Sequence, residues 1–499
     1  MNGSLPGKPD SNFVMLVDTV SRIAGSEMVY LVGGAVRDLY LGQPSHDLDF
    51  ALAGGVKPLA RRVADDLHGD FFMLDEERST ARVIYYPPPA GRVFLDFALL
   101  RGASIEDDLR GRDFTVNAMA LDLRHPTELI DPLGGHADLE ARQLRLASST
   151  ALKDDPVRVL RAVRQSLALD FPLEPAMLST LRRAAHRLKA SSVERQRDEL
   201  FKILEGSRVS AAVRILDQID ALSLLLPELE PLKGVAQPSP HIYDVWDHTL
   251  ALLDALESML DLVDGSKPAN PLLEMAASEL ERFMPQIKAH LNAALNPNRA
   301  LRGLLFLAGL YHDVAKPAAR APGPDGRIHF IGHEEAGAET VTRRAWELAL
   351  SQNEVQRLQD IVAGHMRIHL LAQAGLALSR RSTYRFFKRT GTAGVDICLL
   401  SLADTLATYG PNLPLDFWQT ELAICRQLLA AWWENPSESV APPRLLTGDD
   451  LITKLNLTPG PQIGELLAAI QEAQACGEIS DRQQALDYAV KYLEKRKEK

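Results

Sequence analysis

The chain has 499 residues, 46% of them hydrophobic and 24% charged, a composition that excludes a fibrous or largely disordered protein. This length exceeds what one hydrophobic core organises, so we expect about two to four domains. The formal net charge of −11 argues mildly against an RNA partner. Affinity for nucleic acid depends, however, on where Lys and Arg gather rather than on their sum.

The three cysteines, Cys398, Cys425 and Cys476, lie far apart in the chain and form no Cys-x-x-Cys pair. We therefore expect neither a disulfide framework nor a zinc site, and a reducing cytoplasm fits this pattern. Residues 1–12 lack the apolar core of a signal peptide. No run of roughly 18 apolar residues occurs, so no membrane span is predicted.

The first part of the chain, residues 28–135, is predicted to be α/β. Short apolar runs rich in Val, Leu and Phe predict strands at 28–32, 48–52 and 93–99. The prolines of Pro87–Pro89 predict a loop before the last of these strands.

From Asp138 onward, apolar residues recur at the spacing of amphipathic helices, which predicts a mostly helical remainder. The sequence Gln237-Pro238-Ser239-Pro240 predicts a linker, and a second helical block follows to about residue 407. A third segment runs from Pro442 to a charged helix at residues 491–499.

A diglycine, Gly33-Gly34, stands between a predicted strand and a predicted helix. Bare backbone at this point lets N–H groups and a helix N-terminus approach an anion such as a triphosphate. Arg37 follows one turn into the helix and can bind phosphate as a planar fork. Taken alone, a diglycine is more often an ordinary turn. It indicates an anion-binding site only in combination with the residues that follow it.

Two carboxylates, Asp47 and Asp49, alternate with Leu48 and Phe50 in the second predicted strand. Residues i and i+2 of a strand point to one face, so the two carboxylates meet on one side. They repel each other unless a cation neutralises them. Two Mg²⁺ ions roughly 3.5–4 Å apart would do so, and would activate a 3′-hydroxyl and steady the leaving pyrophosphate. Asp96, on the third predicted strand, is expected to supply a third acid.

Further motifs follow in order over roughly residues 28–205. The set is Gly33-Gly34-x-x-Arg37-Asp38 with Leu41-Gly42 and Asp47-x-Asp49, then Asp108 to Ala118, Asp131 to Leu139, Asp154 to Arg164, and Glu194-Arg195 with Glu199-Leu200. In this order the motifs resemble those of the class II tRNA nucleotidyltransferases and bacterial poly(A) polymerases, which belong to the DNA polymerase beta superfamily. Two positions depart from the family pattern, since Gly111 replaces an Arg and Asp154 replaces a Glu.

The resemblance implies a role for each matched residue. Asp47 and Asp49 would bind Mg²⁺. Asp155 and Arg158 would read the base in place of a template strand, accepting C and A, which share an exocyclic amine, and rejecting U and G. The other nucleotide contacts implied are Gly33, Gly34, Arg37 and Arg161, with Arg112 on the triphosphate and Asp113 and Asn117 on the sugar side.

A second set of residues, in the order His, His-Asp, His, His, Asp on predicted helices, resembles the HD metal-dependent phosphohydrolase superfamily. Neutral imidazole with carboxylate suits a divalent metal such as Mg²⁺, Mn²⁺ or Ni²⁺, which would activate water against a phosphoester. Roughly 60 residues with a polar insertion separate the first His from the His-Asp pair, a long spacing for a compact domain. The ligands implied are His248, His312, Asp313, His333, His365 and Asp404.

The expected architecture is an α+β N-terminal nucleotidyltransferase head, with a DNA polymerase beta-like mixed sheet and helices, followed by a mostly α-helical neck, HD domain and tail. The neck would carry the nucleotide-selecting and RNA-binding motifs. We predict an N-terminal extension with the first helix at 1–27, the head at 28–140, the neck at 141–236, the HD domain at 237–410 and a helical tail at 411–499.

The motifs predict an enzyme that adds C and A from CTP and ATP to the 3′ end of tRNA, with an HD phosphohydrolase in the same chain. Poly(A) addition to another RNA 3′ end is the alternative, because the two subfamilies share the motifs; the HD domain and a tail motif near Gly460 favour tRNA. A chain that is mainly a phosphohydrolase, or a non-catalytic RNA-binding protein, is disfavoured by the intact acidic residues. Whether CC, A or CCA is added stays open, as does the oligomeric state.

Overall fold

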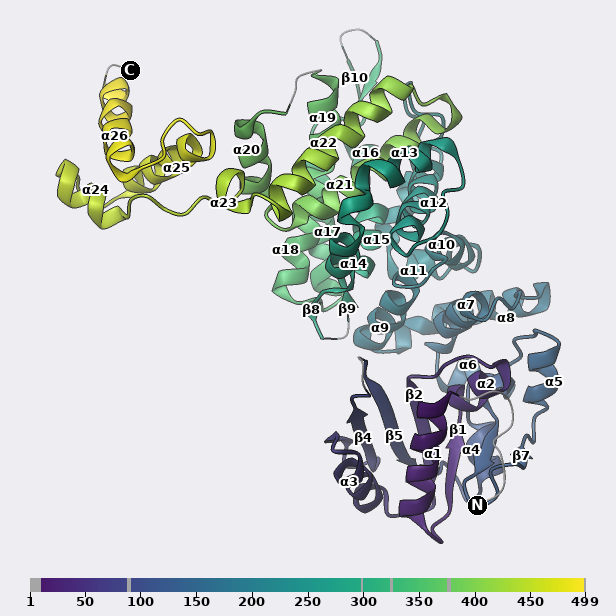
Figure 1. Cartoon of the computed structure of the whole chain (residues 1–499). Helices are drawn as coiled ribbons and strands as arrows, with labels where there is room; N and C mark the ends of the chain where they lie inside the picture. Colours follow the sequence, from purple (N-terminus) through teal and green to yellow (C-terminus); the bar gives the residue numbers. More distant parts are fainter. Residues whose placement is uncertain (1–9, 88–90, 298, 324–325, 375–377, 498–499) are drawn as a thin grey trace. The chain divides into compact units, whose positions relative to one another are not determined.

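Figure 1 shows a computed structural model of the chain, which describes residues 10–87, 91–297, 299–323, 326–374 and 378–497. The first nine residues of the predicted N-terminal extension lie outside these ranges, as do most of the predicted Pro87–Pro89 loop and the last two residues of the terminal helix. Among the helices of the described ranges, none is both long and apolar enough to cross a membrane.

The chain divides into two compact units. The first contains Met1–Glu199 and Ile215–Leu224, and the second contains Leu200–Arg214 and Leu225–Lys499. The first unit holds the predicted head, and the second holds the predicted HD domain and tail. The finer boundaries within the neck stay predictions.

The first unit is built on a seven-stranded sheet in the order β3-β4-β5-β2-β1-β6-β7. The pair β2 and β5 is parallel, and the other neighbouring strands pair antiparallel, so the sheet is mixed, as predicted. The strands are β1 (Val29–Val32), β2 (Asp47–Leu52), β3 (Asp70–Asp75), β4 (Thr80–Tyr85), β5 (Val93–Leu99), β6 (Ala120–Asp122) and β7 (Leu129–Ile130).

Burial on the two faces of β2 explains the sequence of that strand. Leu48 and Phe50 are at most 1% exposed, and the Phe50 ring stacks on that of Phe97 in β5. On the other face, Ala51 joins a smaller core with Ile105 and Leu109 of α4 (Ile105–Arg110). The acidic residues of β2 therefore lie on the face that this smaller core covers only in part.

Helices and short 3-10 turns complete the first unit. The helix α2 (Gly34–Leu41) starts directly at the end of β1, and α7 (Arg158–Ala168) carries the predicted nucleotide-selecting residues. The others are α1 (Ser11–Ala24), α3 (Val56–Leu67), η1 (Thr115–Asn117), α5 (Gly135–Glu140), α6 (Ala151–Asp154), α8 (Pro175–Ala185) and η2 (His186–Ala190), while α9 (Val193–Leu204), α10 (Val209–Gln218) and α11 (Leu222–Leu225) run across the division between the units.

The second unit is mostly helical, as predicted, and four helices that contact one another form its centre: α12 (Val245–Val263), α15 (Leu301–Tyr311), α18 (Gln352–Gly364) and α21 (Ala393–Tyr409). Further helices surround them: α13 (Pro271–Leu280), α14 (Met284–Asn292), α16 (Lys316–Ala319), α17 (His333–Glu347), α19 (Arg367–Gln373), α20 (Arg380–Thr390), α22 (Leu415–Trp433) and α23 (Pro436–Ser439). Short elements connect these: η3 (Pro227–Leu232), η4 (Glu281–Phe283), η5 (Gly410–Asn412), and the hairpins β8 (Ala294–Asn296) with β9 (Arg299–Ala300) and β10 (Ala321–Pro322) with β11 (Ile328–His329).

The tail of the second unit has a small core of its own. Leu451, Leu466 and Ala489 are fully buried in it. They come from α24 (Gly448–Leu455), α25 (Pro461–Ala475) and α26 (Arg482–Lys497).

The long spacing between the first HD histidine and the His-Asp pair is filled by structure rather than by a loop. The helix α12 continues to Val263, and α13 and α14 pack against it before α15 begins. The apolar residues Leu273, Leu280 and Ile287 of the inserted helices are buried. The insertion therefore extends the helical core, and the spacing does not disrupt the domain.

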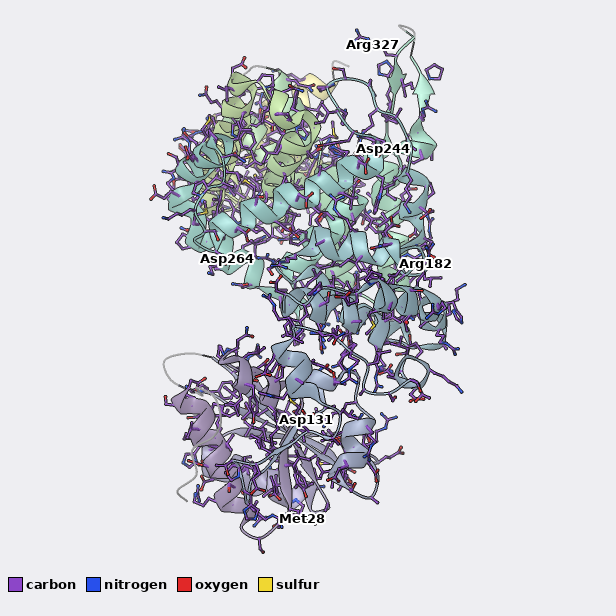
Figure 2. The ribbon with its side chains drawn as sticks, turned by 90° about the vertical axis from the view of Figure 1, so that its right-hand side faces the viewer. Met28, Asp131, Arg182, Asp244, Asp264 and Arg327 are labelled. Atoms are coloured by element: carbon purple, nitrogen blue, oxygen red, sulfur yellow. The ribbon has the colours of Figure 1, made fainter. Side chains whose placement is uncertain are left out.

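We predict that Gly135→Ala destabilises the first unit. A Cβ at Gly135 would lie 2.1 Å from the backbone oxygen of Thr115, while the carboxylate of Asp131 (labelled in Figure 2) fixes the segment by accepting the backbone N–H of Gly135 at 2.7 Å. Overpacking of this kind costs about 1–3 kcal/mol or more. Thermal unfolding should show a lower melting temperature for Gly135→Ala but not for Gly54→Ala, because nothing lies within 4 Å of a Cβ at Gly54. Equal melting temperatures for the two variants would contradict this packing.

Candidate active site and metal centre

Three predicted acidic residues lie side by side on the sheet of the first unit. Asp47 and Asp49 share one face of β2, and the parallel register with β5 sets Asp96 directly beside Asp49. Asp96 is bound bidentately by Arg82 of β4, with Nε–Oδ1 and Nη2–Oδ2 distances of 2.7 Å each. Its charge is therefore matched by a guanidinium, which leaves Asp47 and Asp49 as the pair available to a cation.

Burial perturbs the ionisation of Asp49. Burial raises its pKa to about 6; Arg112 and Arg161 lower the pKa, whereas Asp96 and Asp47 raise it further. A carboxylate whose charge is disfavoured in this way gains more than an ordinary one from a bound cation. The geometry and charge fit a divalent metal at Asp47 and Asp49, although these acids are not among the tight groups of three ligands found in the described residues.

Gly33 lets the backbone pass close to this pair. It has a φ of +79°, and a Cβ there would lie 2.8 Å from Nη1 of Arg112 and 3.2 Å from Oδ2 of Asp49. Arg112 is anchored through Nε and Nη2 to Oδ2 of the buried Asp108, at 3.0 Å each. Its remaining nitrogen, Nη1, faces Gly33 at the start of α2, where a triphosphate is predicted to bind.

A chain of hydrogen bonds connects α2 to α7. Arg37 donates through Nη1 to Oδ1 of Asn117 at 2.7 Å. Asn117 in turn donates through Nδ2 to Asp113 at 3.0 Å and to Gln165 at 2.9 Å. Nη2 of Arg161 lies 3.1 Å from Oδ2 of Asp113. The structure thus brings together four of the predicted nucleotide-binding residues, Arg37, Asp113, Asn117 and Arg161.

Asp113 is charged within this chain. Burial disfavours the charge, but Arg161, the amide of Asn117 and the backbone N–H of Phe114 outweigh it, so its pKa is lowered. Its Oδ1 accepts from Phe114 at 2.8 Å. The carboxylate therefore serves to position Asn117 and Arg161.

The two predicted base-reading residues have protein partners in this structure. Arg158 is 7% exposed, and donates to the backbone oxygens of Gly111 at 2.8 Å and Arg112 at 3.1 Å. Asp155 accepts from Nη2 of Arg195 at 2.6 Å. Arg158 thus ties α7 to the turn that positions Arg112, and base reading would require both side chains to exchange these partners. Their role in base choice stays a prediction.

Four residues around this site were not assigned a role from the sequence: Arg82, Asp108, Gln165 and Arg195. The position of Gln165 near this site could have been predicted from the sequence, because Gln165 follows Arg161 by four residues and so shares its helix face. The position of Arg82 could not, since its pairing with Asp96 depends on the register of β4 and β5.

The second unit contains two buried groups of possible metal ligands, one of His248, His312 and Asp404 and the other of Asp313, His333 and His365. Within each group the ligand atoms lie within 4.8 Å of one another. These are the six residues that the sequence singled out, and the structure brings all of them together from α12, α15, α17, α18 and α21 and their ends.

Asp313 lies between the two groups. Its Oδ2 is 3.1 Å from Nε2 of His312 and 3.7 Å from Nε2 of His248, while its Oδ1 is 3.3 Å from Nε2 of His333 and 3.8 Å from Nε2 of His365. One carboxylate oxygen thus faces each group. A bridging carboxylate with histidines on both sides has the donor set of a site for two divalent transition metals.

The imidazoles are oriented for metal binding. Nδ1 of His312, His333 and His365 lies 2.7–2.8 Å from a backbone oxygen three residues earlier, so the Nδ1–H donates there and Nε2 faces the other ligand atoms. Burial lowers the pKa of His365 to about 3, and the neighbouring His312 and His333 act in the same direction. The neutral imidazole that a metal requires is therefore the stable form of His365.

His369 is a residue near this centre that the sequence interpretation missed. Its Nε2 lies 2.8 Å from Asp404 and its Nδ1 lies 2.6 Å from the fully buried Glu421. Burial opposes its charge, but Glu421 and Asp404 raise the pKa of His369 to about 10. The imidazolium holds Asp404 in place. Its position four residues after His365 offered a weak signal, weakened further because α18 ends at Gly364 and a new helix, α19, begins at Arg367.

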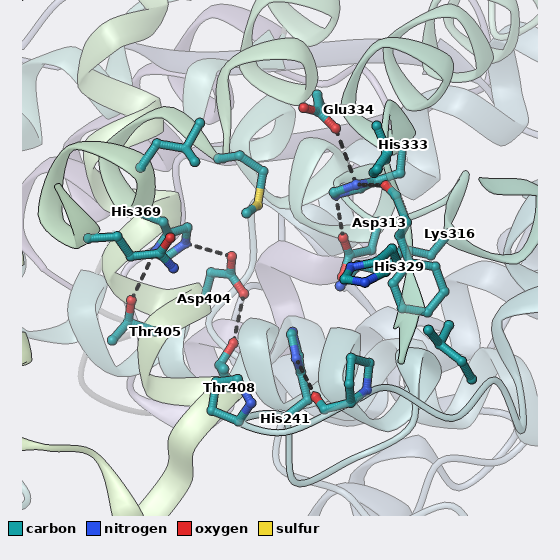
Figure 3. A pocket seen from close by; sticks show the side chains of 18 of the residues that line it. His241, Asp313, Lys316, His329, His333, Glu334, His369, Asp404, Thr405 and Thr408 are labelled. Atoms are coloured by element: carbon teal, nitrogen blue, oxygen red, sulfur yellow. Dashed lines mark hydrogen bonds and ion pairs between the residues drawn. The ribbon is translucent and has the colours of Figure 1, made fainter. Parts of the chain in front are cut away.

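A cavity of about 530 Å³ opens onto this centre, as Figure 3 shows. Asp313, His333, His369 and Asp404 line its polar side together with Lys316, whose Nζ lies 2.6 Å from Oδ2 of Asp313. The opposite walls are largely apolar, and Pro238, Phe330, Met366, Leu370, Tyr409 and Phe417 contribute to them. An apolar enclosure with a charged end suits a ligand that joins an organic ring to a phosphate.

Comparison with known proteins identifies both the head and the HD domain. A family model described as "Poly A polymerase head domain" matches residues 29–145, and one described as "HD domain" matches residues 272–408. An A-adding tRNA nucleotidyltransferase of Deinococcus radiodurans is 37% identical, over 93% of this chain and 95% of its own. A CC-adding tRNA nucleotidyltransferase of Thermus thermophilus is 31% identical, over 91% of each chain.

Solved structures share the fold. A CCA-adding enzyme in complex with ATP has a TM-score of 0.60 at 21% identity, covering 97% of this chain and 96% of its own. The Thermotoga maritima CCA-adding enzyme complexed with tRNA has a TM-score of 0.56 at 21% identity, with 97% of each chain covered.

The fold and the two sites define a nucleotidyltransferase head joined to an HD domain. With the full-length relatives, they show that the chain belongs to the class II tRNA nucleotidyltransferase and bacterial poly(A) polymerase family, in a form that carries an HD domain. It is a nucleotidyltransferase.

We predict that Asp49→Asn stabilises the first unit at high pH while it removes activity. The pKa of Asp49 is about 6 in the folded chain against 3.8 as its ordinary value, so ionisation opposes folding from about pH 4 upward and fully above pH 6. Without divalent ions, the variant should melt at a higher temperature than the wild type at pH 8, and the difference should shrink at pH 4.5.

The matched control is Asp65→Asn, because Asp65 is exposed on α3. It should leave the melting temperature unchanged at both pH values. A difference for Asp49→Asn that is the same at pH 8 and pH 4.5 would contradict the assigned pKa.

Proposed function

We propose that the head transfers a nucleotide from ATP or CTP to the 3′-hydroxyl of tRNA. The observation that carries the proposal is the pair Asp47 and Asp49 on one face of β2, beside the diglycine and Arg112. When bound there, two Mg²⁺ ions would supply activation of the 3′-hydroxyl and neutralisation of the leaving pyrophosphate. Poly(A) addition, the alternative from the sequence, has no counterpart among the full-length relatives described above.

The chain's own residues account for the remaining steps. Arg112, held by Asp108, binds and orients the triphosphate against the start of α2. The chain from Arg37 through Asn117 and Asp113 fixes the sugar side. Such fixed groups lower the barrier because they need no reorganisation when charge develops.

The step within CCA synthesis is best supported as addition of the terminal A. The A-adding relative is 37% identical, whereas the CC-adding relatives of Thermus thermophilus and Geobacter sulfurreducens are 31% and 32% identical. CC addition is the second candidate, because these relatives also match over more than nine-tenths of the chain. Base choice would rest on Asp155 and Arg158 after they exchange their present partners.

We predict that Asp47→Ala reduces nucleotide addition by several decades, because one of two metal ligands is lost. The assay offers CTP, ATP, UTP and GTP singly and together to tRNA that ends before CCA and to tRNA that ends in CC. Wild type should use ATP on tRNA ending in CC and reject UTP and GTP by at least about tenfold. Asp65→Ala is the control and should keep wild-type rates. Addition by Asp47→Ala within about tenfold of wild type, a loss of only roughly 1.4 kcal/mol, would contradict the site.

We further propose that the HD domain hydrolyses a phosphoester. The six ligands around Asp313 would hold two divalent metals, which when bound would supply an activated water. Lys316, 2.6 Å from Asp313, is placed to bind the phosphate once a metal takes over the carboxylate. The apolar walls of the cavity would hold the organic part, such as the ribose and base of a cyclic phosphate at an RNA 3′ end.

We predict that Asp313→Ala abolishes hydrolysis and spares nucleotide addition, because its carboxylate faces both groups of ligands in the second unit. Hydrolysis of bis(p-nitrophenyl) phosphate and of adenosine 2′,3′-cyclic phosphate with Mn²⁺, Ni²⁺ or Mg²⁺ measures the first activity. Glu339→Ala, exposed on α17, is the control for the helix that carries His333. Equal loss of both activities in Asp313→Ala would show that the sites are not separable.

A further inference from the structure

The helix α20 is unusually basic for a chain with a net charge of −11. Its sequence, Arg-Arg-Ser-Thr-Tyr-Arg-Phe-Phe-Lys-Arg-Thr, contains five basic residues and no acidic one. Tyr384, Phe386 and Phe387 are buried and fix the helix against the domain. The exposed face therefore presents a stripe of basic residues, Arg381, Arg385, Lys388 and Arg389. Arg381 is paired with Glu472 and Glu478, so the unpaired charge gathers toward the end of the helix at Lys388 and Arg389.

This stripe borders a cavity of about 720 Å³ between α19 and α20. Four cationic residues and one acidic residue, Glu472 of α25, line it together with apolar side chains such as Leu370 and Phe386; the four are Arg367 of α19 and Arg385, Lys388 and Arg389 of α20. We call it the α19–α20 groove.

The positive charge in the groove is only partly neutralised. Arg385 pairs with Glu472 of α25 at 2.7 Å, but among the described residues no carboxylate lies within the 4.0 Å of an ion pair from Arg367, Lys388 or Arg389. Lys388 instead lies over the ring of Tyr384, 5.4 Å from its centroid.

Arg367 has incomplete hydrogen bonding in the groove. Its Nε is buried and finds no hydrogen-bond partner among the residues that the structure describes. Arg389 lines the same groove, so two guanidinium groups lie around one cavity. Like charges held together with an unused buried donor are the arrangement that an anionic ligand relieves.

The groove adjoins the cavity of the HD centre. Leu370 lines both cavities, and Arg367 lies one helical turn before it on α19. A nucleic acid strand with its terminal phosphate at Asp313 and Lys316 can therefore continue past Leu370, with its preceding phosphodiesters among the cations of the groove. A free mononucleotide would occupy only the HD cavity and would not contact the groove.

We propose that the α19–α20 groove binds the phosphodiester backbone of a single-stranded RNA 3′ end whose terminal phosphoester is hydrolysed at the HD centre. The substrate class is then a polynucleotide end rather than a free nucleotide. Cations supply the affinity, which makes it dependent on salt and independent of sequence. This inference rests on the hydrolysis proposed above.

The test compares two substrates: a ten-residue oligoribonucleotide ending in a 2′,3′-cyclic phosphate, and adenosine 2′,3′-cyclic phosphate. In the double variant Lys388→Ala with Arg389→Ala, kcat/KM for the oligonucleotide should fall about tenfold or more, and that for the mononucleotide should stay within twofold. The slope of log kcat/KM against log salt should become shallower by about 1.4, for two lost phosphate contacts.

The control is the double variant Lys267→Ala with Arg343→Ala, which removes the same charge from exposed positions elsewhere in the second unit. It should hydrolyse both substrates as the wild type does. An unchanged rate for the oligonucleotide in the α20 variant would overturn the proposal, and so would an equal loss for both substrates.

If the wild type hydrolyses neither substrate, the proposed hydrolysis is refuted, but RNA binding in the groove is not. A second measurement tests that binding directly. A photoreactive oligoribonucleotide with a 3′-phosphate should label peptides of α19 and α20 in the wild type, and the label should be lost in the α20 double variant. Labelling of other segments only, or labelling that persists in the variant, would overturn the groove.

Discussion

The structure depends on how the charge of buried carboxylates is compensated. Ionised groups withdrawn from water are costly unless a cation or hydrogen bonds take the place of the solvent. Ion pairs compensate three of these charges: Arg82 pairs with Asp96, Arg161 with Asp113 and Lys316 with Asp313. Asp49 is the exception, since burial raises its pKa to about 6 despite Arg112 and Arg161. The residue whose charge the protein compensates least is thus one of the two proposed metal ligands of the head.

The same constraint makes the two units chemically different. In the head, arginines and amides surround the acids, so oxygen ligands and a phosphate-binding wall dominate, which suits Mg²⁺. In the HD domain, histidines whose Nδ1 atoms donate to backbone oxygens surround one bridging carboxylate, which suits transition metals. One chain therefore holds two chemically different acidic sites, one among arginines and amides and the other among buried histidines.

Local pattern predicted much of this arrangement. Strand alternation set Asp47 and Asp49 on one face, and the order of His and Asp residues singled out all six residues of the two buried groups in the HD domain. Local sequence pattern could not predict the pairings between residues that lie far apart in the chain. Arg82 meets Asp96 only through strand register, Glu421 reaches His369 from a helix fifty-two residues later, and Arg158 turns to the carbonyls of Gly111 and Arg112. No individual helix was predicted in the long insertion before His312, and its helices α13 and α14 pack on α12.

Burial disfavours the negative charge of Asp49, and a divalent cation bound at Asp47 and Asp49 would compensate that charge. Infrared difference spectroscopy, with Asp49→Asn to assign the band, can follow the ionisation of this one carboxyl group against pH. Without divalent ions it should titrate near pH 6, and with saturating Mg²⁺ the midpoint should move well below that value. A midpoint near pH 4 without metal, or one that Mg²⁺ does not move, would contradict the account.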